Sequence, residues 1–370
     1  MSNTNFNRRE MMKMTALASA ATLFNPNRLM AQGQAHQAQG ASMIQLARNE
    51  NPYGPGPRAR QAIVAAAGAG NRYAGDETGT LERMIAEREG LQPENVVLAT
   101  GSGEILAMAA VAYGLGEGEI IAADPTFDWM LRYAALLGAK INRVPLDSNS
   151  AHDLNEMSRR ASSRTKLVYV CNPNSPTATI LPTNRLRQFC EDTSKRVAVF
   201  VDEAYLDYLD DFPAPSMVEL VRRDANVVVS RTFSKIYGLA GLRVGYGLAR
   251  KDIADNLRRL RMSWLNTLSL RAAIASLQDV DFVRETRRKN AETRKFVLAE
   301  MDKLKLVHPP SYTNFFALQV GQNGRDLPER VARFGIHIGN ATETGWVRVT
   351  IGTMDEMKSF VKAMRTIFES

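Results

Sequence analysis

Five short runs of this sequence are apolar at every interior position, and longer helical patterns separate them. A strand that is apolar on both sides lies in a sheet whose two faces are both covered, as parallel sheets are. The pattern therefore predicts an α/β protein with a mostly parallel sheet sandwiched by helices. The runs are residues 95–100, 119–124, 166–171, 197–202 and 226–230.

The alternation of apolar runs and helical patterns ends after about residue 270. A long charged helix is expected over residues 280–303, followed by two short strands within 314–320 and 346–352 and a final amphipathic helix. This pattern indicates a smaller α+β domain. We expect four regions: a leader (1–40), an N-terminal arm joining the small domain (41–74), a large cofactor-binding domain (75–265) and a small C-terminal domain (266–370).

The first 40 residues read as a targeting segment. Arg8 and Arg9 precede a weakly apolar stretch rich in Ala, Met and Leu, and a Gln/Ala/Gly-rich segment follows. This pattern is typical of a twin-arginine export signal, with processing near Ala31, and predicts a periplasmic protein. The alternative is a disordered basic tail on a cytoplasmic protein.

Bulk properties exclude several classes of partner. The formal net charge is +8, but no basic run or aromatic-basic pattern accompanies it, so nucleic-acid binding is not expected. No apolar run approaches the ~20 residues of a membrane span. The four histidines show no ligand spacing, and no metal site is expected.

Chemically useful side chains follow each of the five apolar runs. In open α/β sheets, ligands bind outside the carboxyl ends of the strands, so these side chains should meet at one edge. They are, in chain order, Ser102 and Gly103 in a Gly-Ser-Gly turn, Phe127, Asn174, Asp202 with Tyr205, and Ser234 with Lys235. Taken singly, Asp202 would also suit a helix cap, Asn174 a turn and Phe127 the core.

Within this set Lys235 is the candidate nucleophile. A lysine partly removed from water among cations has a lowered pKa and can form a Schiff base with an aldehyde. The Gly-Ser-Gly turn at a helix start is an anion site, and Ser234 and Arg243 add donors suited to a phosphate. The same turn resembles the start of a dinucleotide fingerprint. Leu106 replaces the third glycine of that motif, so a nicotinamide-dependent oxidoreductase is the remote alternative.

As an ordered set, these motifs resemble the class I/II aminotransferases that use pyridoxal 5'-phosphate (PLP fold type I), and histidinol-phosphate aminotransferases in particular. The likeness covers nearly everything after the leader. It runs through "LARNENPYGPGP", "NRYAG", "GSGE", "DPTF", "CNPNSPT", "VDEAY", "SRTFSKIYGLAGLRVGYG", "SYTNFF" and "WVRVTIGT".

The resemblance implies a role for each candidate residue. Lys235 would bind the cofactor and shuttle a proton, Asp202 would pair with the ring nitrogen, and Phe127 would stack on the ring. Asn174 and Tyr205 would hydrogen-bond the ring hydroxyl oxygen. The phosphate would be bound by Ser102, Gly103, Ser234, Arg243 and, from the partner subunit of a homodimer, Tyr73. The substrate would be bound by Arg348, Tyr53 and Asn174.

Two positions depart from the pattern of these relatives. Gly103 stands where an aspartate is usual, and Gly339 stands where enzymes acting on histidinol phosphate tend to have an arginine; His337 and Asn340 are the neighbouring polar residues. We therefore expect a transaminase with altered substrate preference. It would move an amino group between an amino acid, or an amino-alcohol phosphate, and a 2-oxo acid. The alternatives are a PLP-dependent decarboxylase or lyase on the same fold, and a catalytically silent PLP-binding protein.

Overall fold

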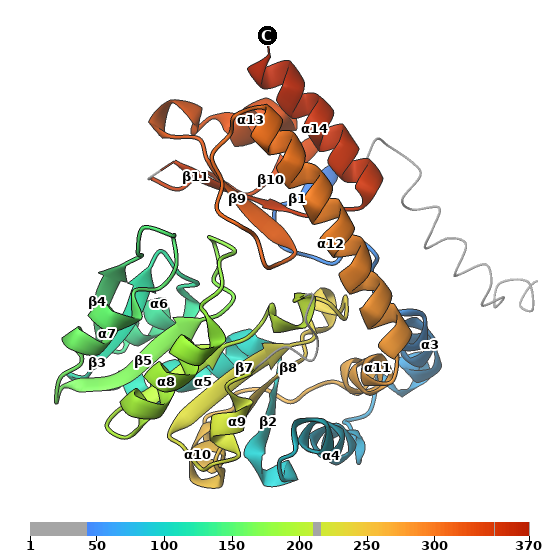
Figure 1. The fold of residues 1–370 in the computed structure, drawn as a ribbon. Coiled ribbons are helices and arrows are strands. Elements are labelled where there is room, and N and C mark those ends of the chain that lie inside the picture. Colours follow the sequence, from blue (N-terminus) through green and yellow to red (C-terminus); the bar gives the residue numbers. More distant parts are fainter. Residues whose placement is uncertain (1–42, 210–215, 344, 370) are drawn as a thin grey trace, which may run out of the picture. The chain divides into compact units, whose positions relative to one another are not determined.

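The computed structural model describes residues 43–209, 216–343 and 345–369. Contacts divide the chain into two units, residues 1–44 and residues 45–370, and the fold described below is that of the second (Figure 1). The predicted export signal lies outside the described residues. The proposed boundaries at residues 74 and 265 stay predictions, because they fall within the second unit.

A seven-stranded sheet forms the centre of this unit, in the order β2-β8-β7-β6-β5-β3-β4 (Figure 1). β8 runs antiparallel to both of its neighbours, and the other pairs are parallel. The strands are β2 (Val96–Ala99), β3 (Glu119–Asp124), β4 (Lys140–Pro145), β5 (Thr165–Cys171), β6 (Ala198–Asp202), β7 (Val227–Thr232) and β8 (Gly245–Ala249). The predicted fold class is confirmed.

Helices cover both faces of this sheet, because its strand residues alternate between two apolar clusters. On β6, Val199 and Val201 face one cluster, and Ala198 and Phe200 face the other. The first face is covered by α4 (Glu77–Glu89), α7 (Leu154–Arg160), α8 (Thr183–Ser194), α9 (Val218–Val221) and α11 (Thr267–Leu277), and the second by α5 (Ser102–Gly114), α6 (Trp129–Leu136) and α10 (Lys251–Arg259).

Two small two-stranded ribbons complete the strand structure. β9 (Phe315–Gln319) pairs with β11 (Trp346–Thr350), and β1 (Ile44–Leu46) pairs with β10 (Ile336–Ile338). The helices of this region are α12 (Val280–Lys303), α13 (Leu327–Ala332) and α14 (Met354–Phe368), while α3 (Pro57–Ala66) packs on α11. α14 begins at a capping box between Thr353 and Glu356, which satisfies amides of its first turn.

The five predicted central strands and the predicted helix over 280–303 are all present. Two strands of the central sheet, β4 and β8, were not predicted, and neither were the short strands β1 and β10. β4 is a polar edge strand, and β8 contains two glycines, which sequence patterns read as a turn. Gly245 in β8 is required by packing, because a Cβ there would lie 2.2 Å from the backbone nitrogen of Ser102. No helix among the described residues is long and apolar enough to cross a membrane.

Candidate active site

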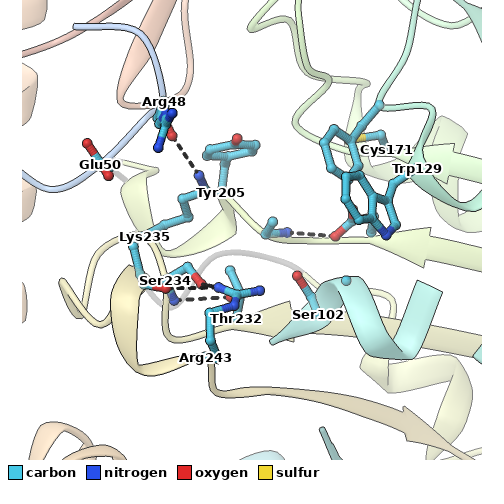
Figure 2. Close-up of a pocket in the computed structure, with 15 residues that line it drawn as sticks. Arg48, Glu50, Ser102, Trp129, Cys171, Tyr205, Thr232, Ser234, Lys235 and Arg243 are labelled. Atoms are coloured by element: carbon cyan, nitrogen blue, oxygen red, sulfur yellow. Dashed lines mark hydrogen bonds between the residues drawn. The ribbon is translucent and has the colours of Figure 1, made fainter. Parts of the chain in front are cut away.

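A cavity of about 310 Å³ opens at the carboxyl ends of the central strands (Figure 2). Each predicted strand end contributes to it, and so does the arm that follows β1. The lining residues are Arg48, Glu50, Ser102, Gly103, Phe127, Trp129, Cys171, Asp202, Ala204, Tyr205, Thr232, Ser234, Lys235, Ala240 and Arg243. The structure therefore brings together most of the residues that the strand ends predicted.

Lys235 is half-buried and its amine points into this cavity (Figure 2). Its Nζ donates to the backbone oxygens of Arg48 and Asn49, both at 3.3 Å, and lies 5.4 Å from the ring centre of Tyr205. Burial, and after it the positive charge of Arg348, lowers the pKa of Lys235 to about 8. About a tenth of this amine is therefore unprotonated at pH 7, far more than of an ordinary lysine, and the unprotonated form is the one that acts as a nucleophile or base.

Asp202 lies at the end of β6 and is 3% exposed. Its Oδ1 accepts hydrogen bonds from Ser230 Oγ at 2.9 Å and from the Ala204 amide at 3.3 Å, and its Oδ2 accepts from Tyr169 Oη at 3.4 Å. Burial raises the pKa of Asp202 to about 6, although these donors oppose the shift. This carboxyl is thus ready to pair with a protonated ring nitrogen.

Tyr205 is buried beside Asp202 and packs edge-on against Phe315, with ring centres 5.0 Å apart. Its hydroxyl oxygen accepts a hydrogen bond from Asn49 Nδ2 at 2.9 Å. Burial raises the pKa of Tyr205 to about 12, so the hydroxyl keeps its proton. Because the oxygen already accepts from Asn49, the proton is left to donate to a ligand in the cavity.

The other end of the cavity is an anion site. Ser102 and Gly103 open α5, so their backbone amides lack intrahelical acceptors. Arg243 Nη1 donates to Ser234 Oγ at 3.2 Å, and a Cβ at Gly101 would lie 2.2 Å from Arg243 Nη2. The guanidinium therefore lies directly over the glycine turn, and backbone and side-chain donors converge there.

Two aromatic side chains line the cavity between these ends. Phe127 was predicted, but Trp129, which is 44% exposed, was not. A Cβ at Gly103 would lie 3.8 Å from Trp129 Nε1, so the indole N–H lies beside the anion site. Nothing in the sequence indicated that this indole would be the neighbour of Gly103.

Arg348 lies on β11 with its guanidinium over the ring of Phe315, at 5.7 Å. Nη1 donates to Ser175 Oγ at 3.3 Å and Nη2 to the Ala47 oxygen at 2.9 Å. Its Nε is buried and has no hydrogen-bond acceptor among the described residues. The positive charge of Arg348 reaches Lys235, since it contributes to the lowered pKa of that amine. The predicted substrate-binding arginine does not line the cavity of Lys235 but a second pocket, and only its charge is felt at the candidate nucleophile.

Asn174 does not line the cavity, contrary to the sequence prediction. Its Oδ1 accepts from Thr126 Oγ1 at 2.8 Å, and its Nδ2 donates to Thr177 Oγ1 at 2.9 Å and to the Pro125 oxygen at 3.2 Å. These bonds within and beside its own loop satisfy the amide and hold it away from the cavity. The next residue, Ser175, is the one that contacts Arg348.

Tyr53 and Tyr73 also lie outside this cavity. Tyr53 was predicted to line the substrate pocket, but its ring lies under Lys289 Nζ, at 4.9 Å, in a separate pocket against α12. A turn directs it there, in which Asn51 Oδ1 accepts from the Tyr53 amide. Tyr73 is 91% exposed, so within a single chain it contacts nothing in the cavity.

The residues present fit PLP. The cavity has convergent phosphate donors at one end, a half-buried amine, a buried carboxylate opposite the amine, and aromatic rings between. A group of three or more potential metal ligands does not occur in the described part of the chain. Such a cavity, at the edge of a mostly parallel sheet, is typical of an enzyme that uses a phosphorylated aldehyde cofactor.

The comparisons with known proteins agree with this definition. The family model "Aminotransferase class I and II" matches residues 41–364, and the chain belongs to that family. The chain is 37% identical over 330 residues to a histidinol-phosphate aminotransferase of Moorella thermoacetica, covering 88% of this chain and 85% of that protein. The predictions of an aminotransferase and of PLP as its cofactor are confirmed.

Solved structures show the same fold. A histidinol-phosphate aminotransferase from Sinorhizobium meliloti, solved in complex with pyridoxal 5'-phosphate, superposes with a TM-score of 0.82 at 25% identity, covering 89% of this chain and 92% of that one. An aspartate aminotransferase from Thermotoga maritima superposes with a TM-score of 0.77 at 23% identity, covering 93% and 96%. The predicted fold type is confirmed by these neighbours.

Proposed function

We propose that this transaminase takes its amino group from an amino acid with a free α-carboxylate, and that histidinol phosphate is a poor substrate. The observation that carries the proposal is the backbone at Gly339. Its amide donates to the Arg348 oxygen at 3.0 Å, and a Cβ at this position would lie 2.7 Å from the same oxygen. Position 339 therefore supplies no second guanidinium beside Arg348, and any side chain there would require the backbone to shift.

Neighbouring polar residues do not replace that guanidinium. His337 Nδ1 contacts Gln45 Oε1 at 3.0 Å, and Asn340, which lines the same pocket as Arg348, carries no charge. A carboxylate needs one guanidinium fork, whereas a phosphate dianion gains from a second. Loss of one charge-assisted partner costs about 1.5–3 kcal/mol, which corresponds to roughly ten- to a hundredfold in affinity.

The side chains in the cavity divide the catalytic work. When bound, PLP supplies the electron sink for a carbanion at the substrate Cα. Lys235 would hold the cofactor through its amine and move the proton at the substrate Cα. Asp202 would keep the ring nitrogen protonated, and Tyr205 would donate to the ring hydroxyl oxygen. Arg348 would orient the substrate through its carboxylate.

The test is a panel of half-reactions followed by loss of the visible absorbance of the bound cofactor. We expect amino acids to discharge this absorbance with a higher kcat/KM than histidinol phosphate. Lys235→Ala serves as the inactive control and should lack a borohydride-sensitive band. A preference for histidinol phosphate would overturn the proposal, and Arg48→Met would then show whether that guanidinium, which lines the cavity, binds the phosphate.

We also propose a homodimer in which Tyr73 completes the partner's phosphate site. Support comes from the exposure of large apolar side chains, with Tyr73 at 91%, Met262 at 90% and Trp264 at 79%. Light scattering should give twice the chain mass. Mixing inactive Lys235→Ala with inactive Tyr73→Ala should restore part of the activity, because one site of each hybrid dimer is intact. Failure of both measurements would refute a shared site.

Export to the periplasm is proposed on the sequence of residues 1–40 alone. Arg8 and Arg9 ahead of an apolar stretch support it. Fractionation of cells expressing the native chain tests it, with Arg8→Lys/Arg9→Lys as the control that should remain cytoplasmic. An uncleaved wild-type chain in the cytoplasm would contradict it.

A further inference from the structure

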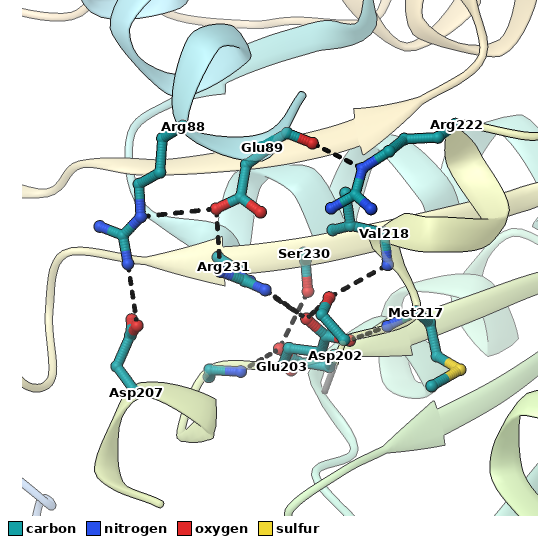
Figure 3. A network of polar contacts seen from close by, with 12 residues as sticks. Arg88, Glu89, Asp202, Glu203, Asp207, Met217, Val218, Arg222, Ser230 and Arg231 are labelled. Atoms are coloured by element: carbon teal, nitrogen blue, oxygen red, sulfur yellow. Dashed lines mark hydrogen bonds and ion pairs between the residues drawn. The ribbon is translucent and has the colours of Figure 1, made fainter. Parts of the chain in front are cut away.

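A buried cluster of charged side chains lies against the strand ends that bear the active-site residues (Figure 3). Arg231, on β7, forms ion pairs with Glu89 Oε1 at 3.1 Å and with Glu203 Oε2 at 3.0 Å. The three side chains are only 7%, 8% and 2% exposed. Glu203 also accepts from Ser216 Oγ and from the Met217 amide, so its carboxylate is fully bonded.

The pairing of β6 with β7 links this cluster to Asp202. Asp202 lies opposite Ser230 in the ladder, and their side chains bond to each other at 2.9 Å. Glu203 and Arg231 follow directly in the two segments, and successive side chains of a strand point to opposite faces. The Glu203–Arg231 pair therefore lies on the opposite face of the sheet from the Asp202–Ser230 pair. The two pairs are joined by the backbone, because the Glu203 amide donates to the Ser230 oxygen at 2.9 Å.

The neighbouring Arg88 extends the cluster to two more active-site segments. Its Nη2 donates to Asp207 Oδ1 at 3.2 Å, and its Nη1 donates to the Tyr237 hydroxyl. Asp207 is two residues after Tyr205, and Tyr237 is two residues after Lys235. The end of α4, where Arg88 and Glu89 are adjacent, thus contacts the segments that follow Tyr205 and Lys235 as well as β7.

We propose that Arg231 is a positioning residue for the cofactor site: by clamping Glu203 and Glu89 it fixes the strand ends that present Asp202 and Lys235. The inference rests on the proposed roles of those two residues. A buried ion pair is weak evidence for a contribution to stability, because apolar residues of similar volume are often as stable in its place. A bidentate guanidinium does fix the geometry of both its partners.

Arg231 also balances charge next to Asp202. The ionisable groups around its guanidinium are Glu89 and Arg88 on α4, Glu203 after β6, Asp207 in the short helix at Leu206–Tyr208, Tyr237 and Tyr246. Without Arg231, the two carboxylates of Glu89 and Glu203 would be left buried behind Asp202. Their charge would favour the protonated form of Asp202, and a protonated carboxyl pairs poorly with the protonated ring nitrogen of the cofactor.

Three variants of the holoenzyme separate positioning from simple stabilisation. Arg231→Lys keeps the charge but loses the bidentate fork. Arg231→Met removes the cation between two buried carboxylates and leaves Glu89 only its 3.6 Å ion pair with Arg88. The triple variant Glu89→Met/Arg231→Met/Glu203→Gln removes the charges of Glu89, Arg231 and Glu203. Its new glutamine oxygen can still accept from the Met217 amide, and its amide nitrogen can donate to Ser216 Oγ. The control is Met364→Ala in α14, because Met364 is fully buried and lies outside the cavity. Its melting temperature should fall by an amount similar to that of the Arg231 variants, so that the other readouts are compared at equal stability.

The readouts are the melting temperature, the dissociation constant of PLP, the pH midpoint of the bound cofactor's visible band, and kcat. We expect Arg231→Met to melt lower, and the triple variant to recover much of that loss. Compared with wild type, all three variants should bind PLP about tenfold more weakly and lose roughly ten- to a hundredfold in kcat. The pH midpoint of the cofactor's visible band should also shift in all three. Met364→Ala should leave the last three readouts unchanged.

The proposal would be overturned if the triple variant and Arg231→Lys both kept the wild-type affinity for PLP, pH midpoint and kcat. The cluster would then contribute to stability alone. If Arg231→Met fails to fold, these two variants still decide. Failure of the proposed roles of Lys235 and Asp202 looks different, because Lys235→Ala would then keep the borohydride-sensitive band and Asp202→Asn would keep the wild-type rate.

Discussion

The burial of Asp202 predicts a specific cost to the stability of the cofactor-free enzyme. Burial raises the pKa of this carboxyl from an ordinary value of 3.8 to about 6. A carboxyl whose folded pKa lies above its unfolded pKa binds its proton more tightly in the folded state, so stability falls as pH rises from 3.8 through 6. At about 1.36 kcal/mol per pKa unit, the full cost is about 3 kcal/mol at neutral pH.

Asp202→Asn measures this cost directly, because asparagine keeps an oxygen that can accept from Ser230. Urea unfolding of both cofactor-free proteins gives the free energy of unfolding at each pH. Groups common to both proteins cancel in the difference. Between about pH 4.5 and 7 the variant should gain about 2 kcal/mol relative to wild type, since part of the titration lies below that window.

Two outcomes would refute this reasoning. A stability difference that is constant across the same pH window would show that Asp202 does not titrate with a raised pKa in the folded protein. The same gain in PLP-loaded enzyme would show that Asp202 does not pair with the cofactor, because pairing favours the ionised carboxylate. The variant should also be a much slower transaminase at every pH, since its neutral amide cannot hold the ring nitrogen protonated.

Further variants test the other contacts of the site. Trp129→Phe should remove most of the PLP-dependent quenching of tryptophan fluorescence, whereas Trp264→Phe should leave it, and equal quenching would contradict a cofactor contact. Gly339→Ala should lower stability in a thermal melt by about 1–3 kcal/mol, because its Cβ meets the Arg348 oxygen; an unchanged melt would refute the clash. Ser175→Ala removes a hydrogen bond to Arg348 and should raise KM for the amino acid by roughly fivefold with little change in kcat, as steady-state kinetics would show.

Residue types at the strand ends were enough to predict most of the site. Asp202 and Lys235 both follow apolar runs, and in a parallel sheet the carboxyl ends of such runs meet at one edge. Ser234 and Gly103 were placed at the same edge for the same reason. All four line the cavity. The prediction needed only chain direction, because parallel strands end at the same edge of the sheet in whatever order they lie.

Side-chain direction in irregular segments could not be predicted in this way. Asn174 and Ser175 are adjacent in a loop, both are 2% exposed, and nothing in their sequence says which one faces Arg348. The amide of Asn174 can satisfy itself locally with threonine hydroxyls, and it does. Tyr53 is likewise directed by a local turn, and that turn depends on Asn51 Nδ2 donating to the oxygen of Ile236, far away in sequence.

Within strands, by contrast, the alternation of side chains between the two faces of the sheet decides the role of each residue. Asp202 and Ser230 belong to the cavity face, while Glu203 and Arg231, one residue further along, point to the opposite face and form the buried cluster. A shift of one residue in the register of β6 against β7 would place Glu203 in the cavity and leave Asp202 against α4. Cross-strand bonds on both faces oppose that shift. The register of β6 against β7 therefore determines both the position of Asp202 in the cavity and the formation of the buried cluster.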